Sequence, residues 1–378
     1  MSPSLRSLRF RLAGLACVAL VLAACGNDVA EDRDATTPLA NADAQQTESS
    51  SSDDQQTGAE NEQTESSSPD DGDPTRPGAD DESSDAEPAS LDHAPPPDPA
   101  PPVELSPDET LPNAKRLASD IVQELLTYEV DEAPAEVVNR VVGDRAQGLL
   151  VTAEPILHDE AWSRGEIVYP QLGGFTDEES SVMVVAQQTI GLPDGSASQE
   201  TRTFDVRLAI DDGEWVYDTI ASVGGRPVER PDDLPDVAVE VLDDERIELP
   251  DTARWDIYAG TVRPELLELM SIIAERTEYG VVVFDTGHPQ EVFGTDRQSR
   301  HSLGNAVDVY RLDGPNVIDD RNEGSDLHNF MQWLYEQQGL TKLGAPWALD
   351  GFGGRSFGDT LHQDHLHIES TLRPEQLG

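Results

Sequence analysis

The pattern of hydrophobic and polar positions predicts two folded regions after residue 105. In the first, Ser106-Pro107-Asp108-Glu109 is typical of a helix start, and the apolar residues Leu117, Ile121, Leu125 and Leu126 recur at helical spacing. A second helix is predicted over 133–142. Strand-like runs follow at 166–169, 181–190, 201–210 and 214–217, with turn signals between them. Helices followed by an antiparallel meander predict an α+β domain over residues 106–224.

The second region, residues 237–378, follows a linker rich in proline and charge at 225–236. Strand material is predicted over 237–247, and Pro264 opens an amphipathic helix. A short apolar run at 281–284 predicts a buried strand, and residues 327–335 predict a further helix. The fold class is therefore α+β in both regions.

Two segments near the C-terminus combine strand-like alternation with histidine and aspartate. Residues 306–310 alternate so that Asp308 shares a face with Ala306 and Tyr310, whereas Val307 and Val309 point the other way. Residues 365–369 alternate so that His365, His367 and Glu369 share one face, opposite Leu366 and Ile368. Each segment thus predicts a strand that places polar side chains on one face of a sheet.

These polar side chains predict a metal site. His301 lies seven residues before Asp308, and Gly304 between them permits a left-handed turn that brings the two together. A buried aspartate needs a cation or hydrogen-bond donors. Three N or O ligands with an open position for water make a catalytic zinc site, and His301, Asp308 and His367 can supply one. His365 and His367 can both bind the metal, or one can bind it while the other moves protons.

The motif Ser-x-His-x-x-Gly-x-Ala-x-Asp at 299–308, followed by His-x-His at 365–367, resembles a group of zinc metallopeptidases. The group comprises lysostaphin-type enzymes, D-alanyl-D-alanine carboxypeptidases and the hedgehog N-terminal domain, and the resemblance covers about the last 130 residues. It implies a helix packed on a small antiparallel sheet, with Zn²⁺ on the open face of the sheet held by His301, Asp308 and His367. The element order of residues 106–224 is similar to nuclear-transport-factor-2-like (NTF2-like) or cystatin-like domains.

The resemblance also implies catalytic roles. The carboxypeptidase branch places an acidic base three residues before the last zinc histidine, which is Asp364 here. The histidines His362, His365 and His367 are similar to those of penicillin-insensitive murein endopeptidases, in which the first histidine of His-x-His acts instead. Alternation turns His365 toward the metal, so we expect His365 to be the base, with Asp364 as second candidate.

One part of the family pattern is missing. The carboxypeptidase branch has an arginine in a Ser-Gly-Tyr-Arg-like turn, whereas the matching turn here is Asp285-Thr286-Gly287-His288-Pro289. We expect His288 to take part of that role and Arg297 or Arg300 to supply the missing charge to the substrate. His288 and His362 are also candidates for oxyanion stabilisation.

The N-terminal residues predict export. Arg6, Arg9 and Arg11 precede an apolar run at 12–24 that is too short for a membrane span and is typical of a secretory signal. The ending Leu22-Ala23-Ala24-Cys25 resembles a bacterial lipoprotein processing site. Removal of residues 1–24 would leave a lipidated Cys25 that anchors the protein to the outer face of the cell membrane.

Residues 25–105 predict a disordered tether, acidic at first and proline-rich at its end. From residue 26 to 105 there are 22 acidic residues, two basic ones and no aromatic residue, so this segment cannot bury enough apolar surface to fold. The formal net charge of the whole chain is −50. This charge argues against nucleic acid as a partner, because nucleic-acid binding requires basic residues.

These features predict a cell-surface lipoprotein with zinc peptidase activity on peptidoglycan stem peptides, as a D,D-carboxypeptidase or endopeptidase. An alternative is a zinc-containing module that binds the cell wall without turnover, which the missing arginine favours. A third is an interaction lipoprotein in which residues 106–224, whose partner is unknown, carry the function. A D-Ala-D-Ala bond, a D,D-crosslink and an L,D-bond fit the sequence equally as the bond cleaved.

Overall fold

The structure is a computed structural model that describes residues 95–351 and 353–371. These residues belong to one compact unit. The predicted signal peptide (1–24), Cys25 and most of the predicted tether lie outside them. None of the described helices has the length and hydrophobicity that a membrane span requires.

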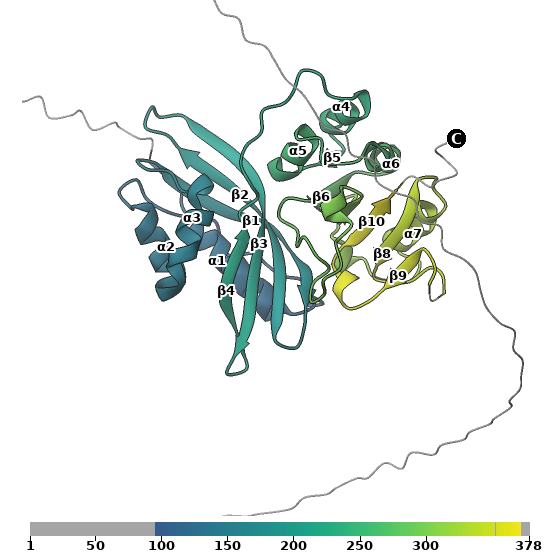
Figure 1. The fold of residues 1–378 in the computed structure, drawn as a ribbon, viewed down its shortest axis with the longest axis horizontal. Helices are drawn as coiled ribbons and strands as arrows, with labels where there is room; N and C mark the ends of the chain where they lie inside the picture. Colours follow the sequence, from purple (N-terminus) through teal and green to yellow (C-terminus); the bar gives the residue numbers. More distant parts are fainter. Residues whose placement is uncertain (1–94, 352, 372–378) are drawn as a thin grey trace, which may run out of the picture. The chain divides into compact units, whose positions relative to one another are not determined.

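A four-stranded antiparallel sheet with three helices on one face forms the first domain (Figure 1). Its strands follow each other in sequence order and are β1 (Trp162–Phe175), β2 (Glu179–Gly191), β3 (Ala197–Asp211) and β4 (Glu214–Ser222). The helices are α1 (Pro112–Leu125), α2 (Pro134–Val142) and α3 (Ala146–Thr152). The predicted meander is confirmed, with strands longer than the sequence indicated.

Helix α1 begins later than predicted. Pro112, rather than residues 106–109, occupies the first turn, after Leu111 in a left-handed conformation with φ 51°. The segment before it runs along the same domain. Arg164 donates to the carbonyl of Pro97 at 2.7 Å and Gln123 to that of Ala100 at 2.8 Å, so residues 97–100 of the expected tether lie against the first domain.

Both faces of the first sheet are covered. On β2, Val182, Val184 and Ala186 pack with the helices, whereas Met183 and Val185 pack with residues of the second domain, which include Val282, Val283 and Tyr310. Strand alternation therefore sends successive side chains into two different cores. This is why β2 is a continuous apolar run rather than a half-polar one.

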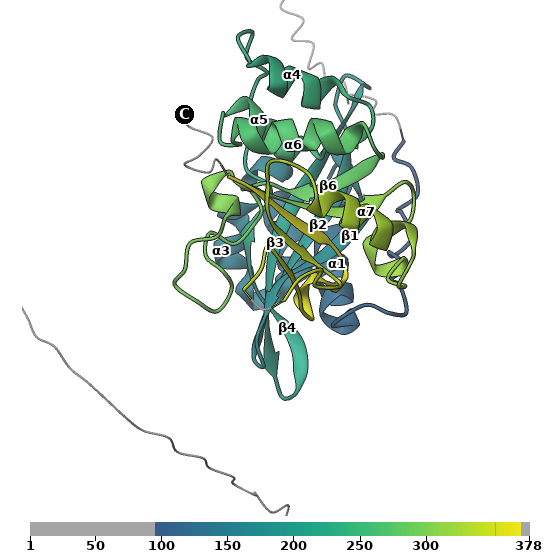
Figure 2. The same cartoon turned by 90° about the vertical axis from the view of Figure 1, so that its right-hand side faces the viewer.

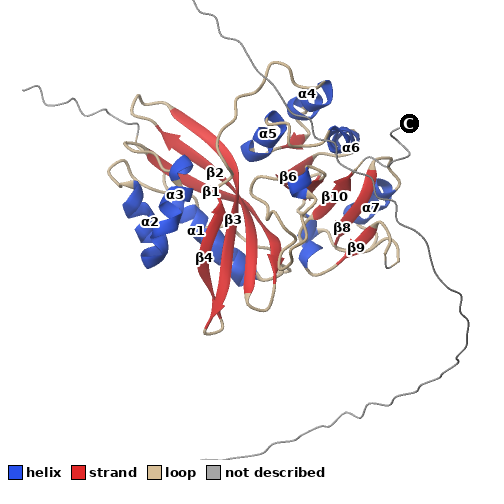
Figure 3. Cartoon of the chain, in the orientation of Figure 1, coloured by secondary structure: helices blue, strands red, loops and turns tan. Residues whose placement is uncertain are grey.

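The second domain contains a mixed six-stranded sheet, coloured green to yellow in Figures 1 and 2 and red in Figure 3. The strand order is β5-β6-β7-β10-β8-β9, and the outer pairs β5–β6 and β8–β9 are parallel. The four central strands are antiparallel, as expected, whereas the two edge strands pair in parallel. The strands are β5 (Ile247–Glu248), β6 (Tyr279–Val283), β7 (Ala306–Leu312), β8 (Leu340–Ala345), β9 (Ser356–Gly358) and β10 (Leu366–Ser370).

Four helices belong to this domain: α4 (Asp236–Asp243), α5 (Asp251–Tyr258), α6 (Pro264–Ala274) and α7 (Asp326–Tyr335). Short 3₁₀ turns complete the described elements of the chain. They are η1 (Gly143–Arg145), η2 (Glu154–Ile156), η3 (His301–Leu303), η4 (Val317–Asp319) and η5 (Leu361–Gln363). The main core of the domain lies between these helices and one face of the sheet, where it includes Val307, Val309, Leu366 and Ile368.

The prediction of strand material over 237–247 is wrong for its first part. Residues 236–243 form helix α4, and only Ile247 and Glu248 form a strand. Several valines favoured a strand, but Ala238, Val241 and Leu242 are the buried residues, and this i, i+3, i+4 spacing is helical.

Candidate metal centre and cavity

Strand pairing brings Asp308 and His367 together. In the antiparallel pair of β7 and β10, Asp308 lies directly opposite His367, as Val307 does Ile368. Directly opposed residues point to the same face and their side chains touch. The Nδ1 atom of His367 lies 3.0 Å from Oδ1 of Asp308. The alternation predicted for both segments thus places these two side chains on the face away from the core of the second domain.

A glycine turn brings His301 to the same place. Gly304 ends the turn η3 in a left-handed conformation with φ 69°, and a Cβ atom there would lie 1.9 Å from the carbonyl oxygen of Thr261. Only glycine fits such a position. The chain folds back at Gly304, and Nε2 of His301 lies 3.2 Å from Oδ1 of Asp308, as the sequence predicted.

Three hydrogen-bond acceptor atoms, one each from His301, His367 and Asp308, lie close together with no donor hydrogen atom between them. Nδ1 of His301 donates to the carbonyl of Phe284 at 2.6 Å, and this contact favours the tautomer with a lone pair at Nε2. Nε2 of His367 faces Glu369 at 3.2 Å, which leaves a lone pair at Nδ1, 3.0 Å from Nε2 of His301. Together with Oδ1 of Asp308, these atoms form a triangle with edges of 3.0–3.2 Å. Three acceptors this close require a cation or an added proton.

The triangle fits a metal ion. Zinc bonds of about 2.0–2.1 Å in tetrahedral geometry separate the ligand atoms by about 3.3 Å, close to the edges found here. The outer hydrogen bonds from His301 to Phe284 and from His367 to Glu369 are the kind that fix the tautomer of metal-binding histidines. The donor set of two imidazoles and one carboxylate also leaves a position for a further ligand.

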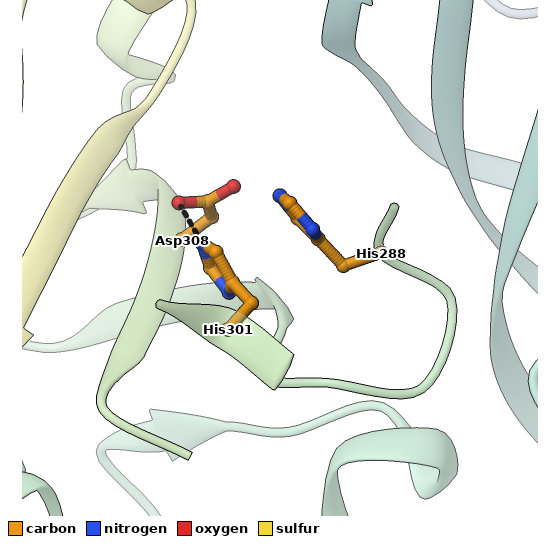
Figure 4. Close-up of side chains that lie close together, drawn as sticks. All are labelled: His288, His301 and Asp308. Carbon is orange, nitrogen blue, oxygen red and sulfur yellow. Dashed lines mark ion pairs between the residues drawn. The ribbon is translucent and has the colours of Figure 1, made fainter. Parts of the chain in front are cut away.

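His288 is a fourth side chain at this place. His288, His301 and Asp308 each offer a ligand atom, and these atoms lie within 4.8 Å of one another (Figure 4). The His288 ring stacks on that of His301, with 3.9 Å between centroids, and its Nδ1 donates to the carbonyl of Pro289 at 2.6 Å. Burial, followed by the neighbouring imidazole of His301, holds the pKa of His288 well below its ordinary value. Neutral His288 therefore presents a lone pair at Nε2, which suits a metal ligand. Its role in oxyanion stabilisation stays a prediction.

The electrostatics indicate a place for positive charge. Burial alone would raise the pKa of Asp308, but the neighbouring imidazoles of His301 and His365 hold it well below its ordinary value. Burial alone would lower the pKa of His367, but its contacts with Asp308 and Glu369 raise it to about 9. A proton on His367 thus takes the position that a cation would hold.

His365 and Asp364 occupy different environments. His365 lines the cavity described below, and its Nε2 lies 3.8 Å from Oδ2 of Asp308. Its Nδ1 lies 2.6 Å from Oδ1 of Asp364. Asp364 is fully buried, and its Oδ2 accepts from Lys115 at 2.5 Å and from the backbone N–H of Leu172 at 3.1 Å. Both oxygen atoms of Asp364 are therefore occupied, whereas Nε2 of His365 faces the candidate metal ligand Asp308.

A cavity of about 880 Å³ opens onto the candidate metal centre. Five of the eight histidines of the chain line it: His288, His301, His362, His365 and His367. Arg297, Arg300 and Lys342 also line it, and Arg300 lies 3.7 Å from Glu369. His362 is held by Asp359, whose Oδ1 lies 2.7 Å from Nδ1 of His362. The predicted site residues in the described part of the chain all border this cavity, apart from Asp364 behind His365.

The first domain supplies residues that the sequence did not indicate. Gln171 donates to Oδ2 of Asp308 at 2.6 Å, and Tyr169 donates to the carbonyl of Asp364 at 3.0 Å. Lys115 lies on the buried face of α1 with Ala118 and Val122. A lysine among apolar residues on a helix face was the one feature of the sequence that could have indicated its role. No pattern pointed to Gln171, because its partner lies 137 positions away.

Comparison with protein families, with curated proteins and with solved structures found no match to this chain.

Proposed function

We propose that the protein is a zinc-dependent peptidase that acts on peptidoglycan stem peptides, as a D,D-carboxypeptidase or endopeptidase. The observation that carries the proposal is the triangle of His301, Asp308 and His367 beside the imidazole of His365. A metal-ligand set, an oriented base and a cavity of about 880 Å³ are the parts that metal-assisted hydrolysis needs.

His301, Asp308 and His367 would hold the zinc ion. When bound, zinc lowers the pKa of a water molecule to about 7 and polarises a carbonyl group. The same donor set suits Fe²⁺, so elemental analysis has to identify the ion. The oriented base beside the centre favours hydrolysis, because proton transfer to and from water is what this reaction requires.

His365 is the proposed base. Its Nδ1 is fixed by Asp364, so Nε2 is free to accept a proton from the attacking water. The water oxygen forms a bond to the carbonyl carbon, the C–N bond breaks, and His365 returns the proton to the leaving amine. Asp364 orients and stabilises the imidazolium that forms, as the carboxylate of a catalytic triad does. We therefore assign Asp364 to orientation rather than to proton transfer.

The rim of the cavity favours a substrate with carboxylate groups. Arg297 and Arg300 are exposed, and Lys342 lies nearby, although the chain as a whole has a net charge of −50. Asp308, Asp359 and Glu369 line the same cavity but contact its histidines, so the exposed arginines are the groups that can attract anionic ligands. Stem peptides end in carboxylates and carry them in their side chains, so this rim is consistent with the proposed substrate.

The proposal includes the finer fold and the location. The second domain would have the fold of D-alanyl-D-alanine carboxypeptidases and hedgehog N-terminal domains, and the first an NTF2-like or cystatin-like fold. The protein would be exported and anchored by a lipid on Cys25, with residues 26 to about 94 as the tether. Mass spectrometry of the mature N-terminus tests this part, because a diacylated Cys25 has a defined mass.

A second candidate is a zinc-containing wall-binding module without turnover. The position of His288 favours it, because four protein ligands would close the site and structural zinc sites are closed. In this alternative His288, His301, Asp308 and His367 all bind the ion, and no position is left for water.

Digestion of purified peptidoglycan separates the two candidates. We expect wild type to release new amino or carboxyl termini, identified by mass analysis of the fragments, and His367→Ala to release none. His328→Ala, which changes a histidine outside the cavity lining, is the control. If wild type binds muropeptides and zinc but yields the same fragments as His367→Ala, the binding module is the correct function.

A further inference from the structure

We propose that the first domain is part of the active site, in which Gln171 positions the metal ligand Asp308 and Lys115 positions the base His365 through Asp364. This inference rests on the proposed function for the role of His365. Residues 106–224 would then be neither a spacer nor a separate interaction domain.

The first contact between the domains joins Gln171 to Asp308. Gln171 on β1 is fully buried, and its amide nitrogen donates to Oδ2 of Asp308 at 2.6 Å. Oδ1 of the same carboxylate belongs to the metal triangle. Hydrogen bonds to the outer atom of a metal ligand fix its orientation, and removing them typically costs 10–100-fold in metal affinity.

A second contact between the domains joins Lys115 to Asp364. Its ammonium group is fully buried between the carboxylates of Glu109 and Asp364, with Nζ 2.5 Å from Oδ2 of Asp364. A buried carboxylate is costly without such a partner. With Oδ2 held by Lys115 and by the N–H of Leu172, Asp364 keeps Oδ1 for Nδ1 of His365. The orientation of His365 therefore depends on a helix of the first domain.

The backbone of β1 is shaped for this contact. The pairing of β1 with β2 shifts register between Leu172 and Gly174, which is a β-bulge. β1 is an edge strand of its sheet, so backbone groups on its outer side are available to other partners, and the N–H of Leu172 bonds to Asp364. Residues 172–175 then continue as one wall of the cavity. The same strand thus supplies a positioning side chain, a backbone donor and a surface for the substrate.

A matched pair of variants tests the role of Gln171 in the full-length mature chain. Gln171→Met removes the donor with little change in shape. Gln188→Met makes the same change on the adjacent strand β2, where Gln188 is equally buried but donates to Ile156 and Ser163. The Oε1 atoms of both glutamines are buried without a hydrogen-bond partner, so both variants also remove an unsatisfied acceptor and should fold.

The readout is zinc affinity, measured by competition with a chromophoric chelator. We expect Gln171→Met to bind zinc 10–100-fold more weakly than wild type, and Gln188→Met to bind it as wild type does. Equal affinities for the two variants, or no zinc binding by wild type, would overturn the inference. If wild type binds zinc but does not cleave, the proposed function fails while this comparison still decides the role of Gln171.

Lys115→Met tests the second arm, with Arg202→Met as control. Arg202 is also buried and paired, with Glu200, away from the cavity. We expect Lys115→Met to keep one zinc per chain and a KM within twofold of wild type, with kcat lowered at least tenfold. A kcat equal to that of Arg202→Met would contradict the role of Lys115. If Lys115→Met does not fold, the comparison of the two glutamine variants decides the inference.

Discussion

Nδ1 of His365 lies 2.6 Å from Oδ1 of Asp364, although the two residues are neighbours in sequence. Adjacent residues of a regular strand point to opposite faces. Here Asp364 lies before β10, at the end of the turn η5, where the backbone is not extended. The carboxylate can therefore approach the imidazole of the next residue, and the two side chains form a hydrogen-bonded pair.

The first prediction follows from this pair. His365→Gln should lower kcat by about 10²–10⁴-fold, because general-base catalysis contributes on that scale. Zinc content should stay at that of wild type, since His365 is not part of the triangle. Steady-state kinetics and elemental analysis of the same sample check both statements. His158→Gln, a change outside the cavity, serves as control, and wild-type turnover by His365→Gln would place the base elsewhere.

His288 distinguishes an open metal centre from a closed one. If three ligands hold the ion, His288→Ala should retain one zinc per chain with affinity within tenfold of wild type. If His288 is a fourth ligand, its removal should weaken binding by much more and should open a position for water. We expect the first result, because the edges of 3.0–3.2 Å already define a site among the other three residues. Chelator competition measures the difference.

Glu109 should make stability depend on pH. Burial raises its pKa from 4.5 to about 7, despite the opposing effect of Lys115. Between these values the folded chain binds more protons than the unfolded chain, so the free energy of unfolding falls as pH rises through this window.

Glu109→Gln should remove this decrease in the free energy of unfolding, which amounts to about 2 kcal/mol between pH 5.5 and 8. Urea unfolding at both pH values measures it. The exposed Glu178→Gln, which leaves the buried ion pairs intact, is the control. The same pH dependence in wild type and Glu109→Gln would show that Glu109 does not titrate in this window.

Gly304 should tolerate no side chain. Gly304→Ala combines a positive φ with a Cβ 1.9 Å from the carbonyl of Thr261, whereas Gly195 has φ 82° and nothing within 4 Å of an added Cβ. Gly195→Ala should cost about 1–2 kcal/mol for the left-handed backbone alone. Gly304→Ala should cost more and should also weaken zinc binding, because the turn carries His301. Equal costs in urea unfolding would mean that the turn relaxes without moving His301.

The parts of the site that sequence reasoning could predict are local. The alternation around Asp308 and His367 follows from strand geometry, and the return of the chain at Gly304 follows from the freedom of glycine. These features depend on residues within ten positions of one another. The convergence of the two motifs was predicted from their combined set of metal-ligand residues and from their resemblance to a family of peptidases, and the structure brings them together through the pairing of β7 and β10.

The parts that could not be predicted depend on distant pairing. Lys115 meets Asp364 across 249 positions, and nothing near either residue identifies the other. Helix α4 was not predicted because its valines favour a strand. Its packing against α6 and the core of the second domain stabilises a helix instead. The parallel edge pairs of the second sheet depend in the same way on where distant segments pack.

Counting metal ions tests the central claim most directly. Elemental analysis of purified wild type and of Asp308→Asn, which keeps the shape of the side chain but removes its charge, should find one zinc per chain in wild type and less than a tenth of that in the variant. A wild type without zinc, or an Asp308→Asn variant with as much zinc as wild type, would contradict a metal centre built from His301, Asp308 and His367.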